Sequence, residues 1–69
     1  MDPYLKSWNL ACLHGSVQGY ERGTVTLQGV SRWAERAFRE GATYEEILAI
    51  LAPHRLELGM EFKVVPPRD

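Results

Sequence analysis

Apolar and charged side chains divide between two sides of a helical wheel from residue 27 to residue 40. The apolar side carries Leu27, Val30, Trp33, Ala34, Ala37 and Phe38. The opposite side carries Arg32, Glu35, Arg36 and Arg39. This division is typical of a helix that packs one side on a core and leaves the other in water. We therefore predict a helix over residues 27–40 that ends at Gly41.

A capping box predicts a second helix soon after that glycine. The hydroxyl of Thr43 is placed to accept from the N–H of Glu46, and the Glu46 carboxylate is placed to accept from the N–H of Thr43. Pro53 makes a longer helix unfavourable, so the predicted range is about residues 44–52. The buried side is expected to hold Tyr44, Ile47, Leu48, Ile50 and Leu51, and the outer side Glu45, Glu46 and Ala49.

The first segment of the chain carries the start and stop signals of a further helix. Asp2 is a favourable N-cap, and Pro3 fits the first helical position because no N–H is needed there. Gly15 is a suitable stop. These signals predict a helix over about residues 3–14.

The apolar residues of this first segment do not form one clean stripe. Leu5, Trp8 and Cys12 share one side of a helix, and we expect that side to be buried. Leu10 and Leu13 lie on its flank, so such a helix needs cover on more than one side. The alternation of Trp8, Leu10 and Cys12 fits a strand as well, and this alternative stays open.

Two β-prone segments complete the pattern. Residues 15–23 contain three glycines and few apolar side chains, which favours a loop, and a short strand is expected near residues 24–26. Residues 56–65 alternate apolar and polar side chains, as a strand or a hairpin does. The inward positions of this last segment are expected to be Met60, Phe62 and Val64.

Together these elements predict a single α+β domain over residues 1–69. A chain of 69 residues builds only a small core and leaves no room for a second domain. Its 45% hydrophobic and 25% charged residues are typical of a packed protein and not of a disordered tail. The order of helix, short strand, two helices and a terminal strand or hairpin is that of a small winged helix.

Three residues carry a resemblance to a known superfamily. Ala37, Gly41 and Ile47 have the spacing of a small residue under a partner helix, a left-handed glycine at the turn and a buried residue of the second helix. On these residues the segment 39–48 resembles the first two helices of many bacterial helix-turn-helix and winged-helix proteins. The resemblance implies a regulator that binds DNA or another protein. An ordinary corner between two helices needs the same residues, so that alternative stays open.

A second resemblance is to short antitoxin-like helix-turn-helix proteins. It is carried by His14-Gly15, Arg22-Gly23-Thr24 and residues 41–48, although the distance from Gly23 to Gly41 is longer than that pattern has. It implies a phage-borne or antitoxin-like regulator that binds DNA as a dimer.

The charges on the second corner helix disfavour DNA binding in the usual mode. Its outer residues Glu45, Glu46 and Ala49 stand where a recognition helix carries cationic or amide side chains, and carboxylates are repelled by phosphates. The remaining nucleic-acid-binding candidates are Arg32, Arg36 and Arg39, extended by Arg55 and Lys63. Intrahelical pairs, Glu35 with Arg39 and Arg36 with Glu40, would explain the same arginines as a solvated face.

Net charge and cysteine content narrow the class of protein further. A formal net charge of -1 argues against affinity that comes mainly from phosphate contacts. Cys12 is the single cysteine, which favours a reducing compartment. The first residues lack the order of a signal peptide, and no uncharged run is long enough to cross a bilayer, so we expect a cytoplasmic protein.

Catalytic and metal-binding signals are weak. The sequence contains no nucleophile elbow, phosphate-binding loop or HExxH motif. Cys12, His14 and His54 are possible ligands, but a packed Cys12 and a His14 at a helix end explain them more simply. We expect no enzyme activity, no cofactor, no metal and no small-molecule substrate.

The sequence therefore favours a regulatory or accessory module that binds another protein or a second copy of itself. The candidate interface residues are Tyr20, Glu45, Glu46, Ala49, Met60, Phe62 and Val64. The alternatives are a sequence-specific DNA-binding regulator and a small subunit of a larger enzyme complex.

Overall fold

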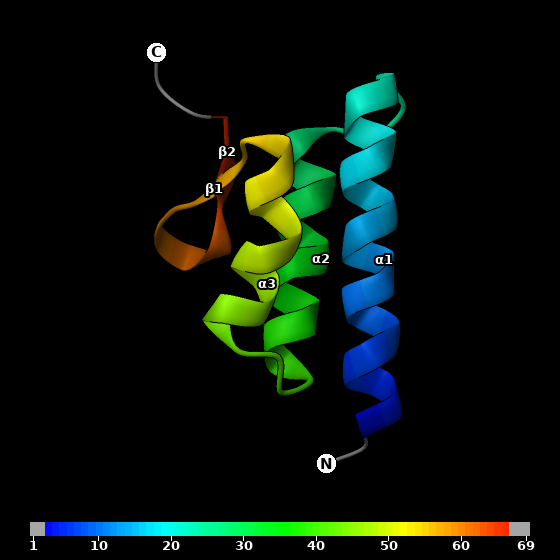
Figure 1. Ribbon diagram of the computed structural model, residues 1–69, viewed down its shortest axis with the longest axis vertical. Helices are drawn as coiled ribbons and strands as arrows, with labels where there is room; N and C mark the ends of the chain where they lie inside the picture. Colours follow the sequence, from blue (N-terminus) through cyan, green and yellow to red (C-terminus); the bar gives the residue numbers. More distant parts are fainter. Residues whose placement is uncertain (1–2, 67–69) are drawn as a thin grey trace.

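In the computed structural model, residues 3–66 are described and form three helices followed by a small hairpin (Figure 1). The helices are α1 (Pro3–Arg22), α2 (Leu27–Arg39) and α3 (Tyr44–Leu51), and the strands are β1 (Glu57–Leu58) and β2 (Val64–Val65). Short 3-10 turns cover Ala52–His54 and Met60–Phe62. The expected cap Asp2 lies outside the described residues.

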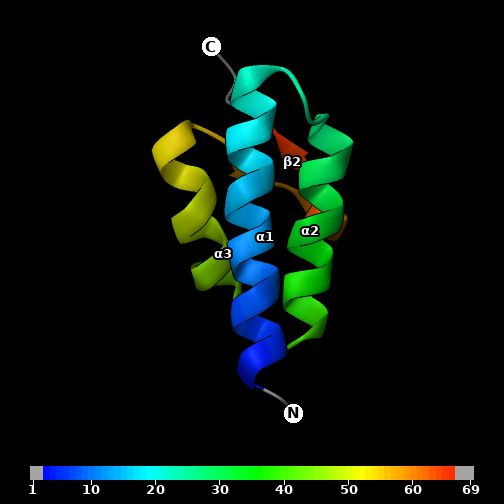
Figure 2. The same cartoon turned by 90° about the vertical axis from the view of Figure 1, so that its right-hand side faces the viewer.

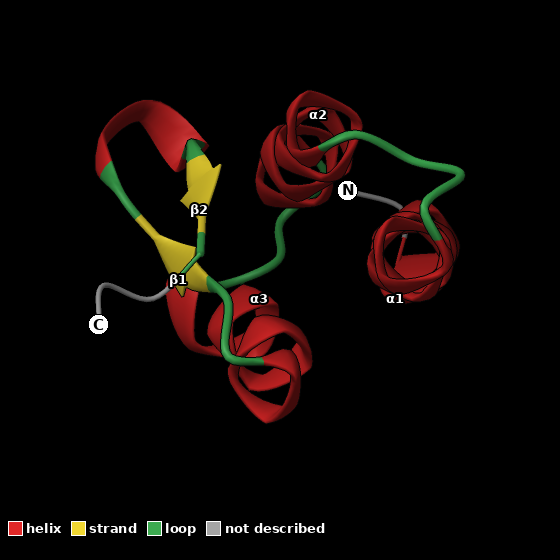
Figure 3. Ribbon diagram, turned by 90° about the horizontal axis from the view of Figure 1, so that it is seen from above, coloured by secondary structure: helices red, strands yellow, loops and turns green. Residues whose placement is uncertain are grey.

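The three helices run side by side in an up-down-up order. Figure 1 shows α1 rising, α2 descending and α3 rising again, and Figure 2 shows α1 in front, with α2 and α3 on either side of it. Seen from above, all three helices are viewed end-on (Figure 3). The α+β class is confirmed for the described residues, with a mainly helical framework and one small antiparallel sheet.

The C-terminal hairpin packs against α2 and α3 on the side away from α1 (Figure 3). Its two strands are antiparallel, with Leu58 opposite Val64. Of the strand or hairpin expected over residues 56–65, the hairpin is therefore present, with two residues in each strand. The Tyr44 hydroxyl donates to the carbonyl of Leu58 at 3.2 Å, which ties the start of α3 to β1. The rings of Phe38 and Phe62, 4.4 Å apart, join α2 to the hairpin tip.

The first helix is longer than its sequence signals indicated. Gly15 does not end it, because glycine with helical backbone angles is tolerated inside a helix at a cost of about 1 kcal/mol. The helix ends instead at Arg22, where Gly23 adopts a left-handed conformation with φ of 83°. The predicted loop over residues 15–23 is therefore wrong, and so is the strand alternative for residues 3–14.

The predicted strand near residues 24–26 is wrong because this segment serves as the turn between α1 and α2. The backbone N–H of Thr24 donates to the carbonyl of Gly19 at 2.8 Å, which folds the chain back onto the last turn of α1. Thr26 is the N-cap of α2, and its hydroxyl accepts from the N–H of Gly29 at 3.1 Å. Backbone N–H groups that donate within this turn cannot also pair with a neighbouring strand.

The buried side of α1 is not the predicted one. Leu13 and Val17 are fully buried, whereas Leu5 is 42% and Trp8 57% exposed, and Cys12 is half-buried. The buried side also includes two polar residues whose side chains donate to backbone carbonyls of α1 itself. Asn9 donates to the carbonyl of Leu5 at 2.7 Å, and Ser16 donates to that of Leu13 at 2.7 Å.

The corner between α2 and α3 follows the sequence prediction. Gly41 is left-handed with φ of 99°, and the next N–H donates to the carbonyl of Ala37 at 3.0 Å. Both bonds of the capping box are present, at 3.1 Å to the Thr43 hydroxyl and 2.9 Å to the Glu46 carboxylate. Two flanking aromatic residues differ from the prediction, since Phe38 and Tyr44 are each about half exposed.

The core lies where the three helices and the hairpin meet. Its apolar members are Leu13, Val17, Val30, Ala34, Ala37, Ala42, Ile47, Leu51, Leu56, Leu58 and Val64. Each helix and each strand contributes at least one of these residues, and Phe62 of the second 3-10 turn packs against them. Within residues 3–66, no helix has both the length and the apolar character that crossing a bilayer requires.

Candidate functional site

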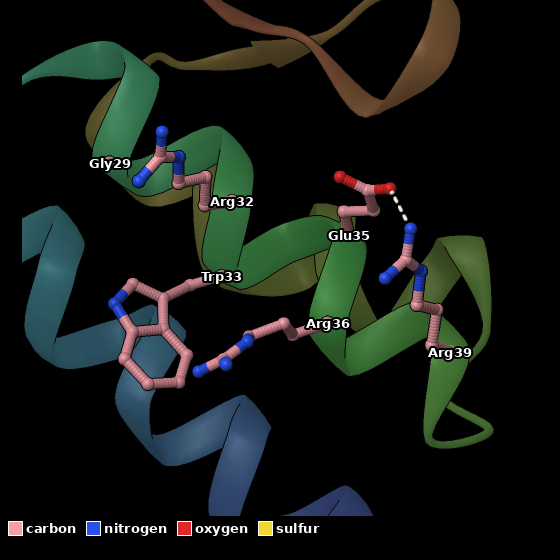
Figure 4. A pocket seen from close by; sticks show the side chains of 6 residues that line it. All are labelled: Gly29, Arg32, Trp33, Glu35, Arg36 and Arg39. Atoms are coloured by element: carbon pink, nitrogen blue, oxygen red, sulfur yellow. Dashed lines mark hydrogen bonds and ion pairs between the residues drawn. The ribbon is translucent and has the colours of Figure 1, made fainter.

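Three arginines lie on the outer side of α2, and two tryptophans border them. We call Arg32, Arg36 and Arg39, with Trp33 of α2 and Trp8 of α1 beside them, the arginine face. The arginines are exposed, and Trp33 is half-buried. An open pocket of about 500 Å³ is lined by Gly29, Arg32, Trp33, Glu35, Arg36 and Arg39 (Figure 4).

Helix geometry explains why these side chains lie together. Positions 32, 36 and 39 are four and three residues apart, which places them on one side of α2. The opposite side is held in the core by Val30, Ala34 and Ala37, so the arginines have to face solvent. Cations are also favoured in the last turn of a helix by its dipole, and Arg36 and Arg39 are in that turn.

The two tryptophans connect the arginine face to α1. The guanidinium of Arg36 lies over the Trp33 ring, 5.2 Å from its centroid, in a cation–π contact. Figure 4 shows both side chains extending from α2 toward α1. A second open pocket of about 310 Å³ is lined by Trp8, Asn9, Trp33, Arg36, Arg39 and Glu40. The two pockets therefore share Trp33, Arg36 and Arg39.

One of the two expected intrahelical ion pairs is present. Arg39 donates to Glu35 at 2.7 Å, with 71% and 46% of the two side chains exposed. No pair between Arg36 and Glu40 is recorded in the described part of the chain, because Arg36 extends over Trp33 instead. Arg32 has neither a hydrogen bond nor an ion pair within residues 3–66. Of the three arginines on this face, Arg32 is thus the one most available to a ligand.

The other nucleic-acid-binding candidates, Lys63 and Arg55, are placed differently. Lys63 lines an open pocket of about 520 Å³ between α2 and the hairpin, together with Gln28 and Ser31 of α2. It therefore lies on the hairpin side of the helix that carries the arginines. Arg55 follows His54, whose Nδ1 is 2.6 Å from the carboxylate of Glu21 on α1. No pocket of the arginine face includes Arg55.

The protein-interface candidates are scattered over several surfaces. Glu45 and Ala49 are exposed on α3, and Met60 is 88% exposed at the hairpin tip, not inward as predicted. Val64 is buried in the core and cannot meet a partner. Phe62 is half-buried, as its ring packs on Phe38.

Tyr20 was expected in an exposed loop, but it belongs to the last turns of α1 and packs against the core. The prediction failed because Gly15 and Gly19 indicated a loop where the helix continues. Tyr20 is therefore not an exposed loop aromatic, since its side chain is half-buried.

Glu46 has a structural task on α3. Its carboxylate accepts from the N–H of Thr43 and lies 3.1 Å from the ammonium of Lys6 on α1. These two hydrogen bonds, that from Thr43 being the stronger influence, hold the pKa of the Glu46 carboxyl below its ordinary value. Glu46 thus joins α1 to α3, which leaves Glu45 as the freer carboxylate on that helix.

The possible metal ligands named from the sequence do not assemble. His14 is exposed in the middle of α1 and not at a helix end, and its ring centroid is 6.2 Å from that of His54. Among residues 3–66, no group of three His, Cys, Asp or Glu side chains is placed to hold a metal ion.

Sequence reasoning found the arginines but assigned both tryptophans to the core. The available signal was the position of Trp33 on the wheel, at the edge of the apolar side and next to the arginines. The pairing with Trp8 depends on how α1 and α2 pack, so no local pattern contains it. Comparison with protein-family models, with curated proteins and with solved structures found no match to this chain.

Proposed function

We propose that this protein is a regulatory or accessory binding module that holds an acidic segment of another protein on its arginine face. The observation that carries the proposal is the gathering of Arg32, Arg36 and Arg39 beside Trp33 and Trp8 in two adjoining open pockets. Arginine, tryptophan and tyrosine are the residues that dominate binding energy in protein interfaces. A guanidinium matches a carboxylate with two parallel hydrogen bonds, so the complementary partner surface is acidic.

Two features favour an acidic protein segment over a nucleic acid. The Arg36 guanidinium covers one face of the Trp33 ring, so that face is not free to stack on a base. The carboxylate of Glu35 lies within the same pocket as the arginines and repels a continuous run of phosphates. A glutamate-rich peptide avoids this repulsion because each flexible side chain can turn its carboxylate toward an arginine and away from Glu35.

The proposal includes a winged-helix-like frame, by which we mean the order of the helices and strands and not the angle between the two corner helices. Three helices followed by a hairpin fit that order, with the hairpin as the wing. In helix-turn-helix proteins the two corner helices cross at about 90–120°. Here α2 and α3 run side by side (Figure 3), and the exposed residues of α3 include Glu45 and Ala49. The proposed working surface is therefore α2 and not α3.

Intrinsic fluorescence tests the proposal directly. Trp8 and Trp33 are the two tryptophans of the chain, and both line the pocket beside Arg36. Titration with a hexaglutamate peptide is expected to change the emission in a saturable manner, with weaker binding at high salt. A charge-assisted hydrogen bond contributes about 1.5–3 kcal/mol, so Arg32→Gln is expected to weaken binding by about tenfold or more.

Arg55→Gln is the matched control, because it removes an exposed arginine outside both pockets and is expected to leave the titration unchanged. Hexalysine should produce no saturable change. The proposal is overturned if hexaglutamate leaves the emission unaltered up to millimolar concentration, or if Arg55→Gln weakens binding as much as Arg32→Gln. Tighter binding of an oligothymidylate than of hexaglutamate would overturn it in favour of a nucleic-acid ligand.

A further inference from the structure

The solvent side of α1 lacks charged residues over most of its length. The exposed residues from position 4 to position 18 are Tyr4, Leu5, Ser7, Trp8, Ala11, His14, Gly15 and Gln18. None of them is Asp, Glu, Lys or Arg, and Tyr4 is 70% exposed and Trp8 57% exposed. A helix on the surface of a monomer normally presents charged and polar residues to water. This outer face of α1 therefore has the composition of a contact surface.

Gly15 lies in the middle of this outer face. A Cβ added there would meet no atom within 4 Å, so nothing inside the chain requires a glycine at that position. A glycine inside a helix lowers helix stability compared with alanine. Ala11 precedes it by one turn, so only small side chains cover the helix there, and Trp8 lies about two turns before Gly15 on nearly the same line of the helix. A large side chain of a partner can therefore approach this helix closely near Gly15.

A second copy of the chain meets these requirements. In an antiparallel pair of α1 helices related by a two-fold axis near Ala11, Trp8 of each copy would lie over Gly15 of the other, because the two positions are nearly equidistant from the axis. The absence of ionised side chains from the centre means that like charges do not oppose one another there. Antiparallel helices also place opposite dipole ends together. A charged partner segment would find no counter-charge on this face.

The expected contact area sets the strength of such a dimer. A helix of 20 residues is about 30 Å long and about 12 Å wide with its side chains, so pairing hides on the order of 350 Å² on each copy. The total of about 700 Å² is below the area that stable specific interfaces bury, so the dimer is expected to be weak and reversible.

We propose that two copies of this chain associate through the outer face of α1, in an antiparallel arrangement with Trp8 of one copy against Gly15 of the other. This surface is separate from the exposed arginines of α2, so the dimer does not depend on the acidic-ligand proposal. Trp8 lies at the border of the two surfaces, and the tests below therefore change other residues.

Sedimentation equilibrium from micromolar to millimolar concentration tests the dimer. The average mass is expected to rise with concentration toward twice the chain mass. Ala11→Arg brings two guanidinium groups together near the axis and is expected to raise the dissociation constant at least tenfold. Ala49→Arg is the matched control, because it changes an exposed alanine on α3, away from this face, and is expected to leave the dissociation constant unchanged.

A crosslink tests the arrangement without relying on affinity. In a Cys12→Ser background, Ala11→Cys is expected to form a disulfide between two copies under mild oxidation, because Cα atoms near the axis of a close helix pair approach to about 5 Å. Ala49→Cys is expected to crosslink far more slowly. A monomer at millimolar concentration, equal weakening by both arginine variants, or equal crosslinking at both positions would each overturn the proposal.

Discussion

The side-chain oxygen of Ser31 accepts a hydrogen bond of 2.8 Å from the backbone N–H of Val64, which lies 33 positions later in the chain. The same hydroxyl donates to the carbonyl of Leu27 at 2.9 Å, so it uses both its donor and its acceptor capacity. Val64 is 2% exposed, so bulk water has little access to its N–H if the partner is lost. One small side chain on α2 therefore fixes β2 in place.

Replacing Ser31 by alanine is expected to destabilise the protein by about 1–3 kcal/mol, because the N–H of Val64 would be left buried without an acceptor. Denaturant unfolding followed by circular dichroism measures the change. Gln28→Ala, on the same helix and exposed, is the control and should stay within about 0.5 kcal/mol of the parent. An equal decrease in the free energy of unfolding of the two variants would show that the Ser31–Val64 hydrogen bond does not stabilise the fold.

Two glycines of α1 are expected to respond to alanine with opposite signs. Gly15→Ala should stabilise the monomer by about 0.5–1 kcal/mol, because the new methyl group meets open space and alanine favours a helix. Gly19→Ala should destabilise it, because the added Cβ would collide with Cγ2 of Val25 and crowd the Thr24 hydroxyl at 3.2 Å.

Thermal unfolding at micromolar concentration, where the proposed dimer is dissociated, compares the two alanine variants. Each variant serves as the control for the other, because both replace a glycine of α1 by alanine. A gain of stability at Gly19 would mean that the turn after α1 relaxes freely, contrary to the close packing of Val25 on Gly19.

The lowered pKa of Glu46 predicts a pH dependence of stability. A carboxyl whose pKa is lower in the folded state stabilises the fold above its ordinary pKa, and this contribution is lost as the pH falls through the folded-state value. Glu46→Gln removes the charge and should therefore lower the melting temperature near neutral pH. At strongly acidic pH, where Glu46 of the parent is protonated, the difference between variant and parent should nearly vanish.

Glu45→Gln is the control for that experiment, since it removes an equal charge from the same helix without touching the Thr43 cap or Lys6. It is expected to produce a smaller difference at neutral pH. A Glu46→Gln variant that differs from the parent by the same amount at both pH values would contradict a role for the ionised carboxylate.

Arg39 is expected to contribute little to stability through its ion pair with Glu35 and more to the binding of an acidic ligand. Both side chains are largely exposed, and exposed pairs of this kind contribute about 0–1 kcal/mol. Arg39→Gln should therefore leave unfolding almost unchanged while it weakens hexaglutamate binding in the fluorescence titration. A loss of stability with unchanged binding would assign the arginine to the fold alone.

The element order was largely predictable, but the sequence indicated an end of α1 at Gly15 and a strand near residues 24–26, neither of which is present. Thr26 lies in the expected strand segment but is the N-cap of α2, a position that threonine favours because its hydroxyl accepts from a backbone N–H, here that of Gly29. Met60 was taken as inward, but positive φ values at Glu61 and Phe62 interrupt the strand alternation and turn the hairpin tip outward. The candidate site was half predictable, because the spacing of three arginines is local and the place of Trp8 is not.

By itself the sequence determined the corner between α2 and α3. Its signals are short-range: a left-handed glycine at Gly41, the reciprocal bonds of Thr43 and Glu46, and apolar spacing that buries Ala37 and Ile47. The side of α1 that enters the core was decided only by the tertiary structure. The apolar residues of α1 are distributed over all sides of the helix, and its buried polar side chains bond to the backbone of α1 itself. No local preference therefore selects the side that is buried. The positions of α2 and α3 select it, because they cover one side and leave Trp8 beside Trp33 and the arginines.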